Sequence, residues 1–160
     1  SSIFGFSKNS NMKFSFIGIV ALYLFASCTQ PAEKKPIPIT GTWELISATS
    51  TSGDSTISTF NPNVKMIKII NPTHFAFLSH DISGVKDSTA AKFTAGGGSY
   101  TLADSVYTEH LDYFVTKEWE GGRFQFVVHI SGDTLIQKGV EKVEKLGIDH
   151  IIVEKYKKVK

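Results

Sequence analysis

The chain has 160 residues, of which 41% are hydrophobic, 12% aromatic and 20% charged, which suits one packed domain and excludes a disordered protein. Seventeen basic residues face 15 acidic ones, and two of the basic residues, Lys8 and Lys13, lie before the cleavage site inferred below. The remaining chain therefore has no net formal charge and a single arginine, which gives no electrostatic footprint for nucleic acid.

The N-terminal segment has the three parts of a secretory signal peptide. Lys13 is a minimal positive region, 14–25 is a run of 12 apolar residues, and Ala26 and Ser27 are the small residues expected before a cleavage site. At about 1.5 Å per residue the apolar run covers roughly 20 Å, which is short of the ~30 Å hydrocarbon core of a bilayer. We therefore expect a signal peptide over 12–27. Residues 1–11 fit no part of it, and we expect them to come from an over-extended reading frame.

The only cysteine, Cys28, follows the expected cleavage site directly. A single cysteine excludes a disulfide within the chain and a cluster of thiolate ligands. The run Leu24-Phe25-Ala26-Ser27-Cys28 resembles the lipobox of bacterial lipoproteins. The resemblance implies that Cys28 carries the lipid and becomes the first residue of the mature chain. It also implies an envelope location, for which we expect the outer membrane, with the domain facing the periplasm or the cell surface.

Residues 28–38 combine three prolines with charged residues, which is typical of an extended tether. From residue 39 to residue 160 the chain reads as one domain. Its apolar and polar residues alternate with a period of two, which predicts half-buried strands. Eight segments are expected to be strands: 41–50, 65–70, 73–80, 99–104, 106–115, 123–131, 134–140 and 149–159. We expect a loop or strand end over 140–146.

Eight sequential strands with short connections predict an all-β fold, an antiparallel up-and-down barrel that closes on itself. A β-sandwich is the alternative. A barrel of eight strands encloses either a packed core or one small ligand. The inward faces are expected to carry these aromatic residues: Phe75, Phe77, Tyr107, Tyr113, Phe124 and Phe126.

The first strand opens with Gly41-Thr42-Trp43-Glu44-Leu45, which resembles the Gly-X-Trp signature of lipocalins. With the later strands, the similarity to small lipocalin-like bacterial proteins covers nearly all of 41–159. The resemblance implies that Trp43 closes the base of the barrel and that a basic residue near the last strand packs across it. In this chain the last strand offers lysines in that role. The resemblance also implies a hydrophobic ligand, and it carries no catalytic residues.

Glu109 alternates in phase with Tyr107 and Tyr113, so it is expected to share their inward face. A buried carboxylate needs a partner or a raised pKa. It could anchor the head group of a ligand, pair with a lysine at the barrel mouth, or stand on a solvated face. The glycine run 96–98 lacks the helix and lysine of a phosphate loop and is expected to permit a positive φ in a turn or a bulge.

The five histidines form no known metal-binding motif, and no nucleophile motif occurs, so we expect no metal, no cofactor and no enzymatic activity. The predicted function is that of a lipoprotein whose barrel binds a small hydrophobic or amphipathic ligand. The candidate ligand-binding residues are Phe75, Phe77, Tyr107, Glu109, Tyr113, Phe124 and Phe126. The alternative is a structural or interaction module with a filled barrel that docks another envelope protein.

Overall fold

The structure is a computed structural model that describes residues 36–84 and 93–160. The expected extension 1–11, the signal peptide 12–27 and Cys28 lie outside the described residues, as does most of the expected tether. The last three residues of the expected tether, 36–38, are described, and among them Ile37 packs against the hydrophobic core. A membrane-spanning helix is absent from the part of the chain that the structure describes.

The described residues form nine β-strands and two short 3-10 helices. The strands are β1 (Gly41–Ser52), β2 (Ser55–Ser58), β3 (Val64–Ile70), β4 (His74–Asp81), β5 (Phe93–Ala103), β6 (Val106–Phe114), β7 (Gly122–Ser131), β8 (Thr134–Val143) and β9 (Ile148–Lys158), and the helices are η1 (Lys117–Trp119) and η2 (Glu144–Leu146). All eight expected segments are strands. The additional strand β2 is a short arm that pairs only with the end of β1.

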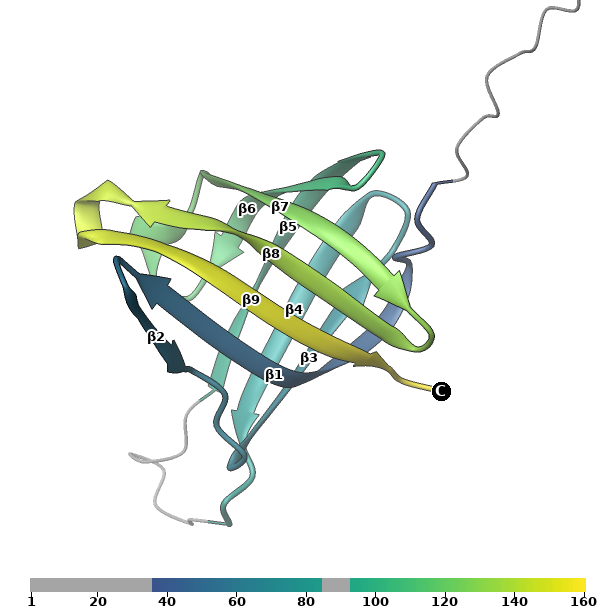
Figure 1. Ribbon diagram of the computed structural model, residues 1–160, viewed down its shortest axis with the longest axis horizontal. Helices are drawn as coiled ribbons and strands as arrows, with labels where there is room; N and C mark the ends of the chain where they lie inside the picture. Colours follow the sequence, from purple (N-terminus) through teal and green to yellow (C-terminus); the bar gives the residue numbers. More distant parts are fainter. Residues whose placement is uncertain (1–35, 85–92) are drawn as a thin grey trace, which may run out of the picture. The chain divides into compact units, whose positions relative to one another are not determined.

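Eight strands close into an antiparallel barrel, which confirms the predicted up-and-down fold and excludes the sandwich. Each strand pairs with the next in the order β1-β3-β4-β5-β6-β7-β8-β9, and β1 pairs with β9 to complete the circle (Figure 1). A bulge between Leu45 and Ser47 bends β1. Its first part pairs with β3 and its last part with β2. Closure leaves no long exposed edge among the barrel strands.

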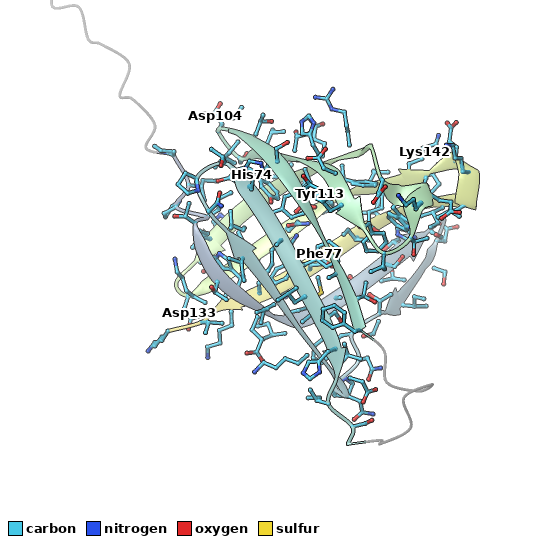
Figure 2. All side chains as sticks on the ribbon, turned by 180° about the vertical axis from the view of Figure 1, so that it is seen from behind. His74, Phe77, Asp104, Tyr113, Asp133 and Lys142 are labelled. Carbon is cyan, nitrogen blue, oxygen red and sulfur yellow. The ribbon has the colours of Figure 1, made fainter. Side chains whose placement is uncertain are left out.

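Alternate connections of such a meander share one end of the barrel. Figure 2 shows the β5–β6 turn at Asp104 and the β7–β8 turn at Asp133 on one side and the end of β8 at Lys142 on the other. Trp43 lies near the Asp133 end, is 1% exposed, and donates its indole N–H to the Ile39 carbonyl oxygen at 2.7 Å. The ammonium of Lys158 lies 4.8 Å from the centre of the Trp43 ring. Aromatic and aliphatic side chains fill this end of the barrel.

A bulge in β6 reverses the expected face of one candidate residue. Gly97 pairs with Tyr113 and Gly98 pairs with Leu111, so Asp112 is an extra residue on β6. The alternation shifts by one position at Asp112, and Phe114 turns inward while Tyr113 is 71% exposed. The prediction that Tyr113 faces inward is therefore wrong. The Asp112 carboxylate stabilises the bulge by accepting the Ser99 backbone N–H at 3.1 Å.

The glycine run 96–98 lies inside β5 rather than in a turn, and it allows two close approaches. A Cβ atom at Gly96 would lie 2.6 Å from the Phe77 ring and 2.7 Å from the Phe114 ring, so the glycine makes room for both aromatic side chains. A Cβ atom at Gly98 would overlap the His110 carbonyl oxygen across the bulge. The expectation of a bulge is thus confirmed, whereas the expected positive φ is wrong, since none of these three glycines has one.

We predict that Gly98→Ala destabilises the barrel by about 3 kcal/mol, because the new methyl group forces β5 and β6 apart at the bulge. Gly121→Ala is the control, since Gly121 has a positive φ of 79° but no atom within 4 Å of its Cβ position. It should cost only about 1 kcal/mol. Urea unfolding measures both changes, and equal losses would show that the bulge is not tightly packed.

Candidate functional site

The barrel encloses a cavity of about 190 Å³ that is partly open to solvent. It lies away from Trp43, on the side of the barrel covered by η1. Its apolar wall consists of Met66, Phe77, Leu111, Phe114, Trp119 and Phe124. Its polar wall consists of Lys68, Glu109, Gln137, Glu141, Glu154 and Tyr156. The cavity therefore joins an aromatic rim to a polar floor.

Three of the candidate ligand-binding residues line this cavity, namely Phe77, Glu109 and Phe124. Three others, Phe75, Tyr107 and Phe126, are at most 3% exposed and belong to the packed core. The seventh, Tyr113, lies on the outer surface because the bulge at Asp112 reverses the alternation of β6. The structure thus divides the candidates among the cavity, the core and the outside of the barrel.

The central feature of the cavity floor is a buried ion pair. Lys68 on β3 donates to Glu109 Oε1 on β6 at 2.8 Å, and the two side chains are only 3% and 9% exposed. Lys68 also donates to Gln137 Oε1 on β8 at 3.2 Å. Its ammonium lies 5.8 Å from the Phe75 ring centre and 5.2 Å from that of Tyr156. Glu109 is therefore an interior carboxylate that is paired with a lysine.

A second carboxylate, Glu154 on β9, continues the polar network. Its Oε2 atom accepts the Tyr156 hydroxyl at 2.6 Å and lies 3.5 Å from Gln137 Nε2. Glu141 on β8 also reaches the cavity, and its Oε2 atom lies 3.0 Å from His150 Nε2. The floor of the cavity is therefore a chain of polar contacts that runs from β3 to β9.

The proton affinities of these groups follow from burial and from their neighbours. Burial disfavours the charge on Lys68, but the carboxylates of Glu109, Glu154 and Glu141 more than offset this effect and keep the pKa of Lys68 above its ordinary value. Burial raises the pKa of the Glu154 carboxyl, and Lys68 and the Tyr156 hydroxyl counteract only part of that rise. Burial, reinforced by Glu154, raises the pKa of the Tyr156 hydroxyl well above its ordinary value, so Tyr156 acts as a hydrogen-bond donor.

Tyr107 carries a buried hydroxyl group whose hydrogen-bonding capacity is not satisfied within the described part of the chain. Its hydroxyl makes no hydrogen bond of good geometry with any described residue. Burial, and then the nearby Glu109 carboxylate, raises the pKa of Tyr107. Its ring packs in the core, 5.1 Å from that of Tyr100 and 6.5 Å from that of Phe75 between ring centres. Tyr107 therefore belongs to the packed core, with its hydroxyl close enough to Glu109 to feel its charge.

The apolar rim of the cavity is an arc of four aromatic rings. The ring centres of Phe77 and Phe114 are 5.7 Å apart, those of Phe114 and Trp119 5.9 Å, and those of Trp119 and Phe124 5.8 Å. Tilted and edge-on pairs at these distances attract one another beyond the effect of burial. Trp119 belongs to η1, so the connection between β6 and β7 completes the rim.

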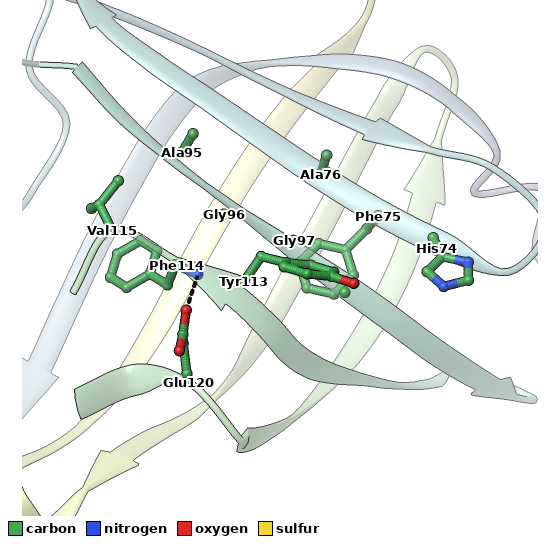
Figure 3. Close-up of a pocket in the computed structure, with 11 residues that line it drawn as sticks. His74, Phe75, Ala76, Ala95, Gly96, Gly97, Tyr113, Phe114, Val115 and Glu120 are labelled. Atoms are coloured by element: carbon green, nitrogen blue, oxygen red, sulfur yellow. Dashed lines mark hydrogen bonds between the residues drawn. The ribbon is translucent and has the colours of Figure 1, made fainter. Parts of the chain in front are cut away.

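A second hollow lies on the outside of the barrel, across β4, β5 and the end of β6. It has a volume of about 440 Å³, and its floor is formed by small residues such as Ala76, Ala95 and Gly97 (Figure 3). Tyr113 and Val115 line this outer groove and are 71% and 59% exposed. At one side, Glu120 Oε1 accepts the Phe114 backbone N–H at 3.3 Å.

The histidines considered in the sequence are dispersed. His110 pairs with Arg123 across β6 and β7, at 3.2 Å between His110 Nε2 and the guanidinium. His74 contacts the Thr73 hydroxyl. Within residues 36–84 and 93–160, no three His, Cys, Asp or Glu side chains are arranged to hold a metal ion.

Sequence reasoning missed most of the polar floor: Lys68, Gln137, Glu141, Glu154 and Tyr156. One signal for Lys68 was present, because Ile70 and Phe75 face each other across the β3–β4 hairpin. Counting back from Ile70 in steps of two gives Lys68 on the inward face. The same count from Ile152 gives Glu154 and Tyr156.

The comparisons with known proteins give no assignment: no protein-family model and no curated protein matches this chain. The function is therefore argued from the geometry of the barrel.

We predict that Lys68→Met destabilises the barrel by about 3–5 kcal/mol, because Glu109 then remains buried without its partner. The double variant Lys68→Met/Glu109→Gln should recover much of this loss, since the unpaired charge is gone. Lys65→Met on the same strand is the control: its ion pair with Glu44 is about half exposed, and its loss should cost less than about 1 kcal/mol. Urea unfolding of the four proteins would contradict the interpretation if the double variant were the least stable.

Proposed function

We propose that this protein is an envelope lipoprotein with a lipocalin-like barrel, whose interior cavity binds a small amphipathic molecule without transforming it. The observation that carries the proposal is the cavity itself, where an aromatic arc faces a polar floor inside a closed barrel. Ligand sites in proteins are concave, mostly apolar, and contain a few placed polar groups. Barrels of eight strands hold one small ligand at such a place.

The size of the cavity restricts the ligand. A volume of about 190 Å³ is below the ~300–1,000 Å³ typical of drug-sized ligands, and it corresponds to about six water molecules. The packed end around Trp43 prevents the cavity from extending through the barrel. A short molecule fits this volume better than a long-chain lipid does.

A binding role agrees with the chemistry of the polar floor. Lys68 is held by Glu109 and Gln137 and keeps its proton, so it is unsuited to act as a nucleophile or base. Among the described residues that line the cavity, none is a serine, threonine, cysteine or histidine. These features favour a carrier or sensor over an enzyme.

Membrane attachment is the second part of the proposal, and the sequence alone supports it. Cys28 follows a short apolar run and two small residues, and it is the one cysteine of the chain. Two or more acyl chains at this position would give stable anchoring, at roughly 0.8 kcal/mol for each buried CH₂ group.

The outer surface of the barrel favours a second candidate function, docking to another envelope protein. Large apolar side chains are exposed on neighbouring strands, among them Leu78 on β4, Phe93 on β5 and Tyr113 on β6. Together with the outer groove they form an apolar area on one side of the barrel. Such areas on soluble surfaces often mark interaction sites.

We predict that the protein isolated from its own cells carries a small molecule, which native mass spectrometry detects as added mass. Leu111→Phe should abolish this added mass, because the larger side chain extends into the cavity. Val127→Phe, a comparable enlargement on the exposed outer face of β7, is the control and should keep it. A wild-type protein that never carries a small molecule would contradict the binding function and favour docking.

We predict that labelled fatty acid is incorporated into the wild-type protein and is absent from Cys28→Ala. The same variant should move from the membrane fraction to the soluble fraction of lysed cells, since it lacks acyl chains. Equal membrane retention of both proteins would refute lipid anchoring at Cys28, and would leave the cavity proposal untouched.

A further inference from the structure

The wall of the interior cavity contains more negative than positive groups. Among the lining residues that the structure describes, Lys68 is the one cation, whereas Glu109, Glu141 and Glu154 are three carboxylates. The ion pair at 2.8 Å neutralises Lys68 and Glu109. Glu141 has a direct partner in His150, at 3.0 Å between Oε2 and Nε2. Glu154 is left without a direct ion pair to any described residue.

Glu154 also has unused acceptor capacity. Both of its contacts, from Tyr156 and from Gln137, involve the Oε2 atom. No donor among the described residues reaches Oε1. An ionised carboxylate offers about four acceptor positions, so a further donor can be accommodated at Oε1.

From these observations we infer that the ligand is a small organic cation, an amine or ammonium with a short apolar body. Its charged head pairs with Glu154 on the polar floor, and its body packs against the aromatic arc. This inference rests on the proposed function, because it names the chemical class of the molecule that the cavity binds.

The polar floor already accommodates one ammonium group, that of Lys68. The Lys68 ammonium lies between the faces of Phe75 and Tyr156, at 5.8 Å and 5.2 Å from the ring centres. Aromatic faces attract cations at these distances.

A carboxylate ligand, such as a short fatty acid, fits the site poorly. Its natural partner would be Lys68, which is already bound by Glu109 and Gln137 at 2.8 Å and 3.2 Å. Its charge would also lie close to those of Glu109 and Glu154. The cavity therefore discriminates between head groups by charge.

The proton affinity of Glu154 supports this argument. Burial raises the pKa of its carboxyl, which means that Lys68 and the Tyr156 hydroxyl do not fully stabilise its ionised form. A cationic head group beside it supplies the missing stabilisation. By linkage, cation binding then favours release of a proton from Glu154 wherever it was protonated.

Three probes of equal chain length test the inference: hexylamine, hexanol and hexanoate. The full-length protein is titrated with each at pH 7.5 in the same nonionic detergent, and the fluorescence of Trp119, which lines the cavity, reports binding. Trp43 lies at the packed end and contributes a constant background. We expect hexylamine to bind at least tenfold more tightly than hexanol, and hexanoate to bind most weakly.

Glu154→Gln keeps the size of the side chain and removes its charge. We expect this variant to lose about tenfold in hexylamine affinity while its hexanol affinity stays unchanged. Glu144→Gln, an exposed residue of η2 outside the cavity, is the control and should match the wild type. Circular dichroism checks the fold of each variant, and the wild-type probe series decides the inference even if Glu154→Gln fails to fold.

The possible outcomes separate the two proposals. If hexanol and hexanoate bind as tightly as hexylamine, the cavity binds small molecules and the inference about charge is overturned. If hexylamine binds best and Glu154→Gln binds it equally well, the role of Glu154 is overturned. If none of the probes changes the fluorescence or protects the barrel from unfolding, the binding function itself fails.

Discussion

The buried ion pair between Lys68 and Glu109 is the interaction on which the interior of the barrel depends. Their strands, β3 and β6, share no backbone ladder, and β8, which supplies Gln137 to the same ammonium, is a neighbour of neither. A slip of one residue in any of these strands would move its polar side chain to the outer face. It would leave the partner charge buried alone, which costs several kcal/mol. The pair therefore fixes the register of strands that the hydrogen-bonded sheet connects only indirectly.

The polar floor also divides the interior into two parts with different roles. On one side the core is packed around Trp43 and Tyr107, and its large apolar side chains exclude water. On the other side the aromatic arc and the polar floor leave about 190 Å³ unfilled. Apolar side chains alone could continue the packed core along the whole length of the barrel. Because charged groups need neighbours that can hydrogen-bond, the layer formed by Lys68, Glu109 and Glu154 interrupts the packing and defines the bottom of the cavity.

The sequence carried enough information for the barrel and for part of the site. Alternation with a period of two located all eight barrel strands, since each has one face toward the core. It failed at β6, where both Tyr113 and Phe114 are aromatic, because one extra residue at Asp112 reverses the phase. The glycine run 96–98 on the paired strand indicated a bulge, but no signal within β6 marks the residue at which the phase changes. Lys68 was missed for a related reason. The neighbouring Ile67 and Ile69 are apolar, which suggests that they face inward and that Lys68 faces outward, whereas Ile69 is 41% exposed and Lys68 is buried. An inward lysine depends on Glu109, which is 41 residues away in the sequence, and alternation within one strand cannot detect such a partner.

The two candidate functions depend on the same short segment of chain. Phe114 lines both the interior cavity and the outer groove, Trp119 lines the cavity, and Glu120 lines the groove while holding the Phe114 backbone. A substitution at Phe114 therefore disturbs both surfaces at once and cannot distinguish a carrier from a docking module. Residues on opposite sides of the barrel wall can do so. Glu154 faces the cavity from β9, and Tyr113 is exposed on the outside of β6, so each can be changed without direct contact with the other surface. The bulge at Asp112 decides which aromatic residue serves which surface, because it reverses the alternation of β6 and turns Phe114 inward and Tyr113 outward.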